Sequence, residues 1–381
     1  MSALIFITAC YCLALHAGNL KTALAGTRRL WIAALCLPML LAATQYASLA
    51  PPLKLRHFDD LFRFFLCIPV YLALLIVRPN IRHFLWGCAF FTVYSAVLMS
   101  WHMHVLGMDR GIAPNGVLGI IPHTSLSIIL GMLAMRLWVA ADGSFRQRLW
   151  PMLLLCSAFS VPLLTQTRSG LALALLLGIL IWILLPNKNI RILLAGGGAA
   201  LVVMALVLFN SNLWSRSDHT FKEIGGYMTG DRSVITSTTA RIELWRVAGK
   251  MFADHPLIGV GNHRYRAALS SYQALGKAPP ELDLFTHPHN EFLKLAAEGG
   301  LFGIVTLALL YFVPLGSAMR RYLRWPSAAN PALMVIIVSS GFLMAGVVDV
   351  MLAWRQTIMF YGVAVSLLLV EMDSSDSVKP T

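Results

Sequence analysis

The sequence predicts an all-α polytopic integral membrane protein with about 11–12 transmembrane helices, and three observations carry this prediction. Hydrophobic residues make up 58% of the 381 residues and charged residues only 12%, whereas about a quarter of a soluble domain is charged. The mean hydropathy is +0.71. Long apolar runs such as 171–186 and 192–209 are flanked by basic residues and approach the ~20 residues that cross a bilayer. A soluble enzyme is therefore excluded.

Eleven apolar segments follow one another along the chain, with one long interruption. They lie at residues 2–19, 31–50, 61–78, 83–105, 117–140, 150–167, 170–186, 192–209, 292–317, 331–349 and 356–370. We expect the chain to divide into an N-terminal transmembrane bundle of about eight helices (1–209), a large loop with amphipathic helices (210–291), C-terminal transmembrane helices (292–370) and a polar cytoplasmic tail (371–381). The first segment lacks a basic start and a clear cleavage site, so we expect it to be retained rather than removed as a signal peptide.

Membrane topology accounts for the net charge of +13 better than nucleic-acid binding does. When the connections are taken alternately, one set and the C-terminal tail hold fourteen Lys and Arg residues, and the other short connections hold six. By the positive-inside rule the first set is cytoplasmic. The remaining ten basic residues lie between 210 and 298 beside nine acids. The long loop is thus nearly neutral, and we expect it on the outer face of the membrane.

The six cysteines give no sign of a disulfide framework or of a metal site. All of them fall within apolar segments, and none has zinc-ligand spacing: Cys10, Cys12, Cys36, Cys67, Cys88 and Cys156. Structural disulfides and a cysteine metal site are therefore not expected.

The long loop reads as a small helical cap. Residues 211–238 are rich in Ser, Thr and Gly, and Thr238 or Thr239 suits the N-cap of an amphipathic helix over 240–254. Its apolar face is formed by Leu244, Ala248, Met251 and Phe252. A tight glycine turn over 258–262, a short polar helix over 263–275 and a last helix that begins after residue 290 and continues into the membrane are expected to follow.

Arg168 lies in Thr165-Gln-Thr-Arg-Ser-Gly170, at the outer junction between two apolar segments. An arginine at the end of a membrane segment is costly and is a candidate for function. The alternative is an arginine that reaches lipid headgroups. Basic residues are scarcer on this face, which favours function.

Arg241 begins the loop helix, with Trp245 one turn later on the same face. A cation is unfavourable near the N-terminus of a helix, so this position favours a ligand. A guanidinium suits bidentate binding of phosphate, and a neighbouring aromatic ring suits a sugar or lipid. The alternative is a solvated helix charge.

His287 and His289 flank Pro288 immediately before the last loop helix. Two histidines at this spacing could bind a metal, although a catalytic metal site needs a third ligand. A neutral imidazole could instead act as a general base or donate a hydrogen bond to phosphate. The third possibility is a histidine that caps the helix. Arg168, Arg241 and His289 together form a cationic set that suits a pyrophosphate substrate. In the last outer loop, Trp354 and Arg355, near Asp349, could help to shape this site.

Several motifs resemble those of a known family. His289-Asn290, nine residues and then Gly300-Leu-Phe-Gly303 match the H-[NSQ]-x9-G-x-x-[GTY] signature of bacterial O-antigen ligases. The stretches 241–245 and 255–261 and the junction at Arg168 are similar to other motifs of the O-antigen ligase/polymerase superfamily. The resemblance implies a GT-C-like helical bundle with one large periplasmic loop. Family members usually have about twelve spanning segments, against the eleven counted in this chain.

The resemblance also implies a reaction. An O-antigen ligase moves a glycan from undecaprenyl pyrophosphate to a sugar hydroxyl of lipid A-core, at the periplasmic face of the Gram-negative inner membrane. Such an enzyme is an inverting glycosyltransferase that needs neither metal nor cofactor. In this reading, Arg168 and Arg241 bind the pyrophosphate, and His289 accepts the proton of the hydroxyl or binds the leaving phosphate. The other expected substrate-binding residues are Trp245, His287, Asn290, Arg216, Arg264 and Arg266.

Three other functions compete with this one. An O-antigen polymerase would use the same donor with a second lipid-linked glycan as acceptor. A protein O-glycosyltransferase would tend to have a longer chain with a larger C-terminal periplasmic part. A transporter of lipid or polysaccharide would need a polar pathway at the bilayer midplane, and ionisable residues are nearly absent from the middle of the apolar segments.

Overall fold

The computed structural model describes residues 2–15, 27–49, 54–108, 111, 118–139, 145–186, 225, 237–327 and 330–374. Every regular element within these ranges is a helix, which confirms the predicted all-α fold class. The apolar segment expected at 192–209 and the candidate ligand Arg216 lie outside the described residues.

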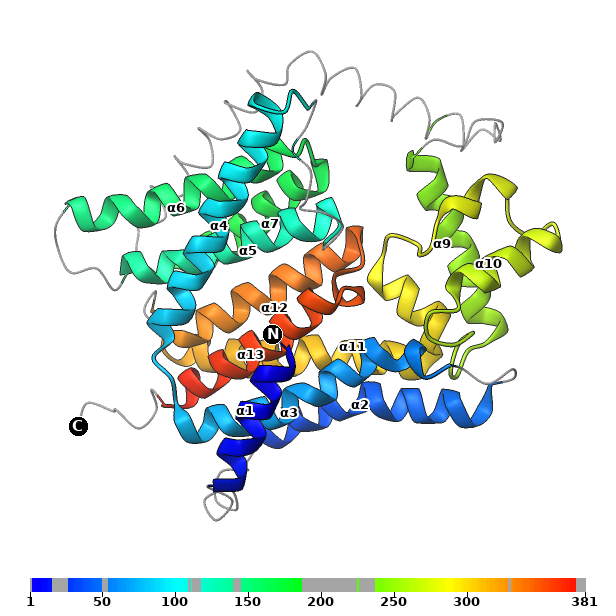
Figure 1. The fold of residues 1–381 in the computed structure, drawn as a ribbon, viewed down its shortest axis with the longest axis horizontal. Helices are drawn as coiled ribbons and strands as arrows, with labels where there is room; N and C mark the ends of the chain where they lie inside the picture. The colour runs from blue at the N-terminus through cyan, green and yellow to red at the C-terminus, as the bar shows by residue number, and fades with distance from the viewer. Residues whose placement is uncertain are drawn as a thin grey trace.

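The apolar segments predicted from the sequence correspond to helices of the bundle (Figure 1). These are α1 (Ser2–Leu15), α2 (Thr27–Ser48), α3 (Asp59–Val77), α4 (Ile81–His104), α5 (Ile120–Val139), α6 (Phe145–Leu164), α7 (Arg168–Leu184), α11 (Glu291–Arg324), α12 (Pro331–Val348) and α13 (Arg355–Ser374). Within the described ranges, six of them are long and apolar enough to cross a membrane, namely α2, α3, α4, α11, α12 and α13, while α5 and α7 contribute shorter apolar stretches.

Helices α11, α12 and α13 lie at the centre of the bundle, between α1–α3 on one side and α4–α7 on the other (Figure 1). One hydrophobic core joins them, because side chains from both sides pack against α12 and α13. Polar contacts add to this packing. Trp31 donates from Nε1 to Ser366 Oγ at 3.0 Å, and Arg28 pairs with Asp373 at 2.7 Å where α2 begins and α13 ends.

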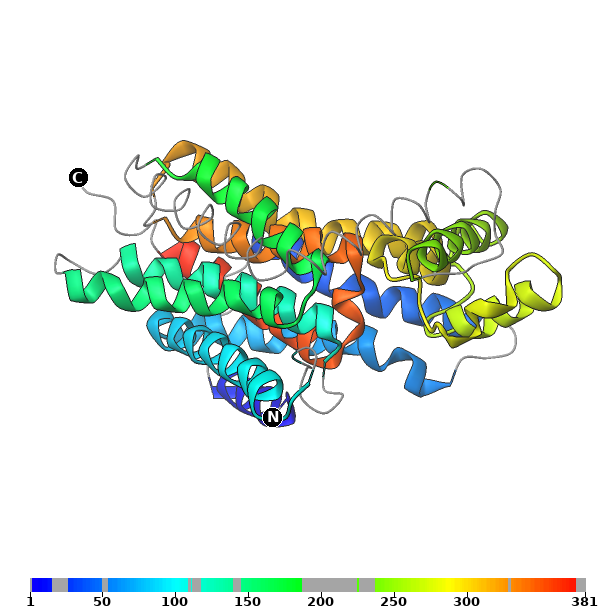
Figure 2. The same cartoon turned by 90° about the horizontal axis from the view of Figure 1, so that it is seen from above.

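The cap consists of α9 (Ser237–Asp254), α10 (Tyr265–Ala274), the 3-10 turn η4 (Pro280–Leu284) and the first turns of α11. Figure 2 shows it at one end of the molecule, where α2 reaches alongside it. Its own core contains Leu244, Ala248 and Met251, as the helical spacing predicts, whereas Phe252 is only partly buried. Helix α9 begins at Ser237, so the predicted N-cap at Thr238 or Thr239 is wrong: both residues lie inside the helix.

A break in α11 joins the cap to the bundle. Gly300 has φ 59° and ψ −152° within an otherwise continuous helix. A Cβ atom at Gly300 would lie 2.4 Å from the carbonyl carbon of Leu257, and one at Gly259 would lie 2.3 Å from the carbonyl carbon of Glu298. The expected glycine turn therefore packs directly against the break, and only glycines allow the two backbones to approach so closely.

Gln45, near the end of α2, bonds to backbone groups of both the break and the glycine turn. Its Nε2 donates to the carbonyls of Glu298 at 2.7 Å and Ile258 at 2.8 Å, and its Oε1 accepts from Asn262 N at 3.0 Å. The Gln45 side chain is fully buried. One amide therefore connects a bundle helix to both halves of the junction.

Candidate active site

His289 lies in the short connection between η4 and α11, immediately before the N-cap residue Asn290. Asn290 accepts from Leu293 N at 3.0 Å, which fixes the first turn of α11. His289 has φ 50°, in the left-handed region that few residues other than glycine adopt. Its backbone N–H donates to Nδ1 of His287 at 3.3 Å. This local bond and the N-cap hold the His289 loop at the end of the bundle that meets the cap.

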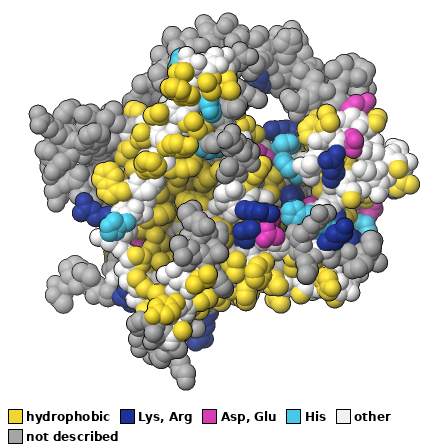
Figure 3. Space-filling model, in the orientation of Figure 1, with side chains coloured by type: hydrophobic (Ala, Val, Ile, Leu, Met, Phe, Trp, Pro, Cys, Tyr) yellow, Lys and Arg dark blue, Asp and Glu magenta, His cyan; other side chains and the backbone are white. Residues whose placement is uncertain are grey.

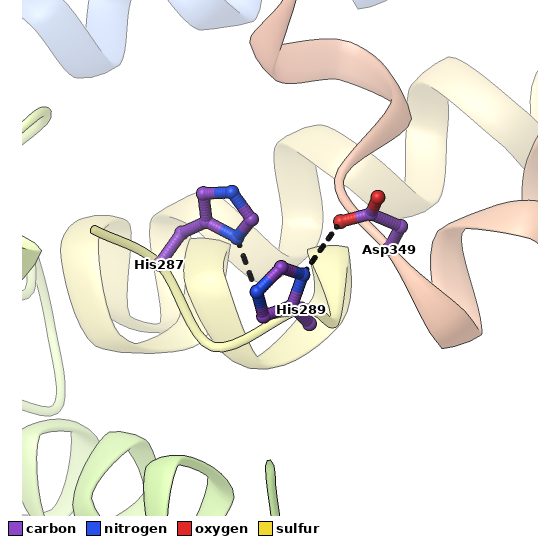
Figure 4. Close-up of side chains that lie close together, drawn as sticks. All are labelled: His287, His289 and Asp349. Atoms are coloured by element: carbon purple, nitrogen blue, oxygen red, sulfur yellow. Dashed lines mark hydrogen bonds and ion pairs between the residues drawn. The ribbon is translucent and has the colours of Figure 1, made fainter. Parts of the chain in front are cut away.

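Asp349 is the partner of His289. It follows α12 as its C-cap residue, and its Oδ1 lies 3.1 Å from Nδ1 of His289 (Figure 4). Burial alone would raise the pKa of Asp349, but the hydrogen bond and charge of His289, together with the backbone N–H of Val350, outweigh it and lower that pKa. An ionised Asp349 accepts from Nδ1–H, so the neutral imidazole keeps the lone pair of Nε2 for a proton.

His287 supports His289. Burial, with a further contribution from the charge of His289, lowers the pKa of His287 to about 4. The ring therefore stays neutral at physiological pH, as the acceptor role of its Nδ1 requires. The two rings meet edge to face with their centroids 4.4 Å apart. These contacts let His287 support His289, and its expected role in substrate binding stays a prediction.

Three further side chains tie the end of α12 and the His289 loop together. Arg241 donates from Nη1 to the carbonyl of Val348 at 3.3 Å. Asn290 donates from Nδ2 to the carbonyl of Val347 at 2.9 Å. Trp245 donates from Nε1 to the carbonyl of Pro288 at 2.8 Å. The predicted residues Arg241, Trp245, His287, His289 and Asn290 thus belong to one hydrogen-bonded group around Asp349.

This group also has the composition of a metal site. Possible ligand atoms of His287, His289 and Asp349 all lie within 4.8 Å of one another. Two imidazoles and one carboxylate form the ligand set of some catalytic zinc sites. In this chain the same atoms already bond to each other, with His289 Nδ1 facing Asp349 and His287 Nδ1 facing the backbone of His289. The arrangement therefore serves two chemistries, a histidine–aspartate base or a metal.

Arg168 lies at the same level of the bundle, on another helix. Tyr322, near the end of α11, bonds to the carbonyl of Leu184 at the end of α7, so these two helices end on the same side of the bundle. Because α12 returns in the opposite direction after α11, it runs antiparallel to α7. They meet where a Cβ at Gly341 would lie 3.5 Å from Leu177. From the rise per residue of an α-helix, Arg168 lies ~14 Å along α7 from this contact, and Asp349 lies ~12 Å along α12 from it. Because the helices are antiparallel, both residues lie on the same side of the contact. The Arg168 residue is exposed at the N-terminus of α7. The hydrogen bonds around Asp349 do not include it.

On the face that Figure 3 shows, charged and histidine side chains gather where the bundle meets the cap, and hydrophobic side chains predominate over the described part of the bundle. Arg264 and Arg266 lie at the start of α10. Beside them, His263 pairs with Asp60 of α3 at 2.9 Å. These two arginines are part of the cap, and the hydrogen bonds described for Asp349 are made with His289 and Val350 instead.

Sequence reasoning did not assign a role to Asp349 or to Glu291. Asp349 was noted only as a neighbour of Trp354 and Arg355, and it lies sixty residues after His289. A single carboxylate at the outer end of an apolar segment is the signal that could have singled it out. Glu291 directly follows the signature residues His289 and Asn290, but nothing in the sequence shows that it is fully buried.

A family model described as O-antigen ligase matches residues 151–308. The matched region contains Arg168, Arg241 and His289, and it ends before Asp349. No curated protein matches the chain.

Proposed function

Because the chain belongs to the O-antigen ligase/polymerase superfamily, we propose that it is an O-antigen ligase. It transfers the O-antigen glycan from undecaprenyl pyrophosphate to a sugar hydroxyl of lipid A-core and so completes lipopolysaccharide. The observation that carries this proposal is the His289–Asp349 pair, which lies beside Arg241 at the end of the bundle that bears the cap. That pair can accept a proton where a lipid-embedded donor would present its pyrophosphate.

The transfer is a single displacement with inversion. The acceptor hydroxyl oxygen forms a bond to the anomeric carbon of the glycan while the bond from that carbon to the pyrophosphate oxygen breaks. The hydroxyl proton passes to Nε2 of His289, and undecaprenyl pyrophosphate leaves with the bonding electron pair. Asp349 stabilises the imidazolium that forms, as a buried carboxylate does for a catalytic histidine. General-base assistance of this kind contributes ~10²–10⁴-fold in rate.

Arg241 and Arg168 stabilise the charge on the departing pyrophosphate. Arg168 begins α7, and Arg241, in the second turn of α9, contacts the carbonyl of Val348 at the end of α12. A guanidinium matches phosphate oxygens with two parallel hydrogen bonds. Removal of one such donor costs about 3 kcal/mol in the barrier. The arginines take the place of a divalent cation, so activity persists in a chelator. Activity lost in chelator and restored by zinc, magnesium or manganese would assign His287, His289 and Asp349 to a metal instead.

The membrane setting follows from the same proposal. The enzyme lies in the Gram-negative inner membrane, with the cap and the His289 loop in the periplasm and the basic connections in the cytoplasm. The undecaprenyl chain lies among the spanning helices, and the core oligosaccharide approaches from the cap.

The test is complementation of a Gram-negative strain that lacks its own ligase, with lipopolysaccharide analysed on a gel. Wild type is expected to produce a ladder on lipid A-core. Arg168→Ala, Arg241→Ala and His289→Ala at matched membrane levels are each expected to erase it. Longer glycan that stays on undecaprenyl pyrophosphate would identify a polymerase. A ladder that survives all three substitutions would contradict the proposed site.

A further inference from the structure

We infer that Glu291 is a positioning residue, which holds the turn after α12 so that the Asp349 carboxylate meets His289. This inference rests on the proposed function for its kinetic test, but its geometry stands on the structure alone. Glu291 is fully buried at the first position of α11. Its two carboxylate oxygens have separate partners, one in the turn that follows α12 and one further along α11.

The first partner belongs to the turn that carries Asp349. Glu291 Oε1 accepts a hydrogen bond from the backbone N–H of Leu352, in the 3-10 turn η5 (Met351–Ala353), at 2.5 Å. Asp349 itself accepts from Val350 N at 2.9 Å. The segment between the end of α12 and the start of α13 is therefore held by one carboxylate of its own and by one from α11.

The second partner anchors Glu291 in the bundle. Tyr311, two-thirds of the way along α11, donates from its hydroxyl to Glu291 Oε2 at 2.5 Å. Tyr311 is fully buried and packs edge to face against Tyr361 of α13, with ring centroids 5.6 Å apart. Tyr311, packed against Tyr361, thus fixes the position of the Glu291 carboxylate. The carboxylate in turn holds the backbone of η5 in place.

The last turn of α12 leaves just enough room for this carboxylate. A Cβ atom at Gly346 would lie 2.9 Å from Glu291 Oε2, closer than van der Waals contact allows. A glycine at this position lets α12 approach Glu291, and any side chain there would push against it.

Three consecutive residues therefore grip one short segment. His289 bonds to Asp349, Asn290 bonds to the carbonyl of Val347, and Glu291 bonds to the N–H of Leu352. Together, these three bonds explain how His289, in a loop, and Asp349, at the end of α12, keep a distance of 3.1 Å between Nδ1 and Oδ1. A catalytic pair that drifts by about 1 Å can lose ~100-fold in rate, so such a clamp has direct kinetic value.

The test is a kinetic comparison in purified membranes or detergent, with lipid-linked donor and lipid A-core acceptor. Glu291→Ala is expected to lower kcat ~100-fold with KM unchanged, because it removes order and not substrate contacts. Glu291→Gln keeps an acceptor for Leu352 N and a hydrogen bond to Tyr311, and it is expected to retain most of the activity. Glu281→Gln, an exposed acid of the same cap, is the matched control.

A double-mutant cycle separates positioning from folding. If Glu291 acts through Asp349, Glu291→Ala adds little to the loss caused by Asp349→Asn. Full additivity of the two losses would overturn the inference, and so would a Glu291→Gln variant as inactive as Glu291→Ala. If Glu291→Ala does not accumulate, Gly346→Ala and Tyr311→Phe perturb the same carboxylate from its two sides. Each is then expected to lower kcat in the wild-type background and to have little effect beside Asp349→Asn.

Hydrogen exchange gives a readout that needs no substrate. In Glu291→Ala the amides of residues 350–354 are expected to exchange faster than in wild type, whereas Glu291→Gln and Glu281→Gln leave them protected. Unchanged protection in Glu291→Ala would overturn the inference. Faster exchange in a chain whose wild type makes no lipopolysaccharide would uphold the clamp and contradict the proposed ligase.

Discussion

At the scale of single residues, the site depends on the backbone of His289 as much as on its ring. A φ of 50° costs a non-glycine residue of order 1 kcal/mol, and the neighbouring bonds offset that cost. The N–H of His289 donates to His287, and Asn290 caps the start of α11 immediately afterwards. As a result, Nδ1 of the imidazole faces the buried carboxylate of Asp349, and the lone pair of Nε2 can accept a proton.

We predict that Asp349→Asn lowers kcat far more than it changes KM. The amide keeps the shape of the side chain but removes the charge that stabilises the imidazolium, and general-base assistance is worth ~10²–10⁴-fold. Steady-state kinetics with lipid-linked donor measure this, with Asp283→Asn, an exposed acid in η4, as the control. Wild-type kcat in Asp349→Asn would remove Asp349 from the mechanism.

A pH prediction concerns His287. Its pKa is lowered to about 4 from the ordinary 6.5, so its contribution to stability is complete above pH 6.5. That contribution is lost as the pH falls toward 4, because the unfolded chain takes up a proton that the folded site excludes. The Tm of wild type is expected to fall across this window more steeply than that of His287→Asn, whose side-chain oxygen accepts a hydrogen bond without titrating.

The control for that experiment is His287→Ala, which lacks any acceptor for His289 N. Its Tm is expected to lie below that of His287→Asn at every pH. Parallel Tm curves for wild type and His287→Asn between pH 7 and pH 4.5 would show that His287 does not titrate as proposed.

At the scale of elements, the break in α11 converts one long helix into a cap helix and a membrane helix. The two glycines of the motif Gly300-Leu-Phe-Gly303 both lie at this break. A Cβ at Gly300 would meet the backbone of Leu257, and one at Gly303 would lie 2.5 Å from the carbonyl oxygen of Leu295. The two glycines of the motif are thus needed for the fold at this break. The break orients the first turns of α11, and these turns position His289 at the end of the bundle.

We predict that Gly300→Ala lowers the Tm by several degrees and weakens activity. Alanine is strained at φ 59°, and its Cβ would collide with backbone atoms that cannot move away. Gly316→Ala in the same helix is the matched control, because nothing lies within 4 Å of a Cβ there, and alanine is the better helix former. Thermal unfolding followed by tryptophan fluorescence compares the two, and equal Tm values would contradict the assigned role of Gly300.

At the scale of the whole molecule, the basic residues and the cap lie at opposite ends of the bundle, which predicts an orientation in the membrane. Basic residues lie where α11 ends, at Arg320, Arg321 and Arg324, and the cap lies at the opposite end of the bundle (Figure 2). If the first end is cytoplasmic, Arg168, Arg241, His289 and Asp349 face the periplasm.

Two substitutions test this orientation. Leu284 in the cap is 88% exposed, and Leu323 near the end of α11 is 65% exposed. In a background with Cys10 and Cys156 replaced by serine, Leu284→Cys is expected to react with a membrane-impermeant maleimide in spheroplasts. Leu323→Cys is expected to react only after lysis. The reverse pattern would place the site in the cytoplasm and exclude transfer onto lipid A-core in the periplasm.

Composition and local spacing establish much of this picture. Apolar runs near the bilayer thickness predict the spanning helices, and amphipathic spacing predicts α9 through Leu244, Ala248 and Met251. Arg241 stands out in the sequence as a cation near an expected helix start, and His289 as one of two histidines that flank a proline. The helix-start argument for Arg241 is wrong, because α9 begins at Ser237 and Arg241 lies in its second turn. Helix starts are less well predicted, since α9 begins before the threonines that suit an N-cap.

Only the tertiary structure decides three of the polar contacts. These are the pairing of Asp349 with His289, the bond from Glu291 to the turn η5, and the bonds of Gln45 across the break. Each joins residues far apart in the chain, and a lone carboxylate or amide looks the same in sequence whether it faces water or a partner. Hydrophobic patterning is periodic and local, so it can be read along the chain. A buried polar contact depends on which helix ends meet, and that depends on how the whole bundle packs.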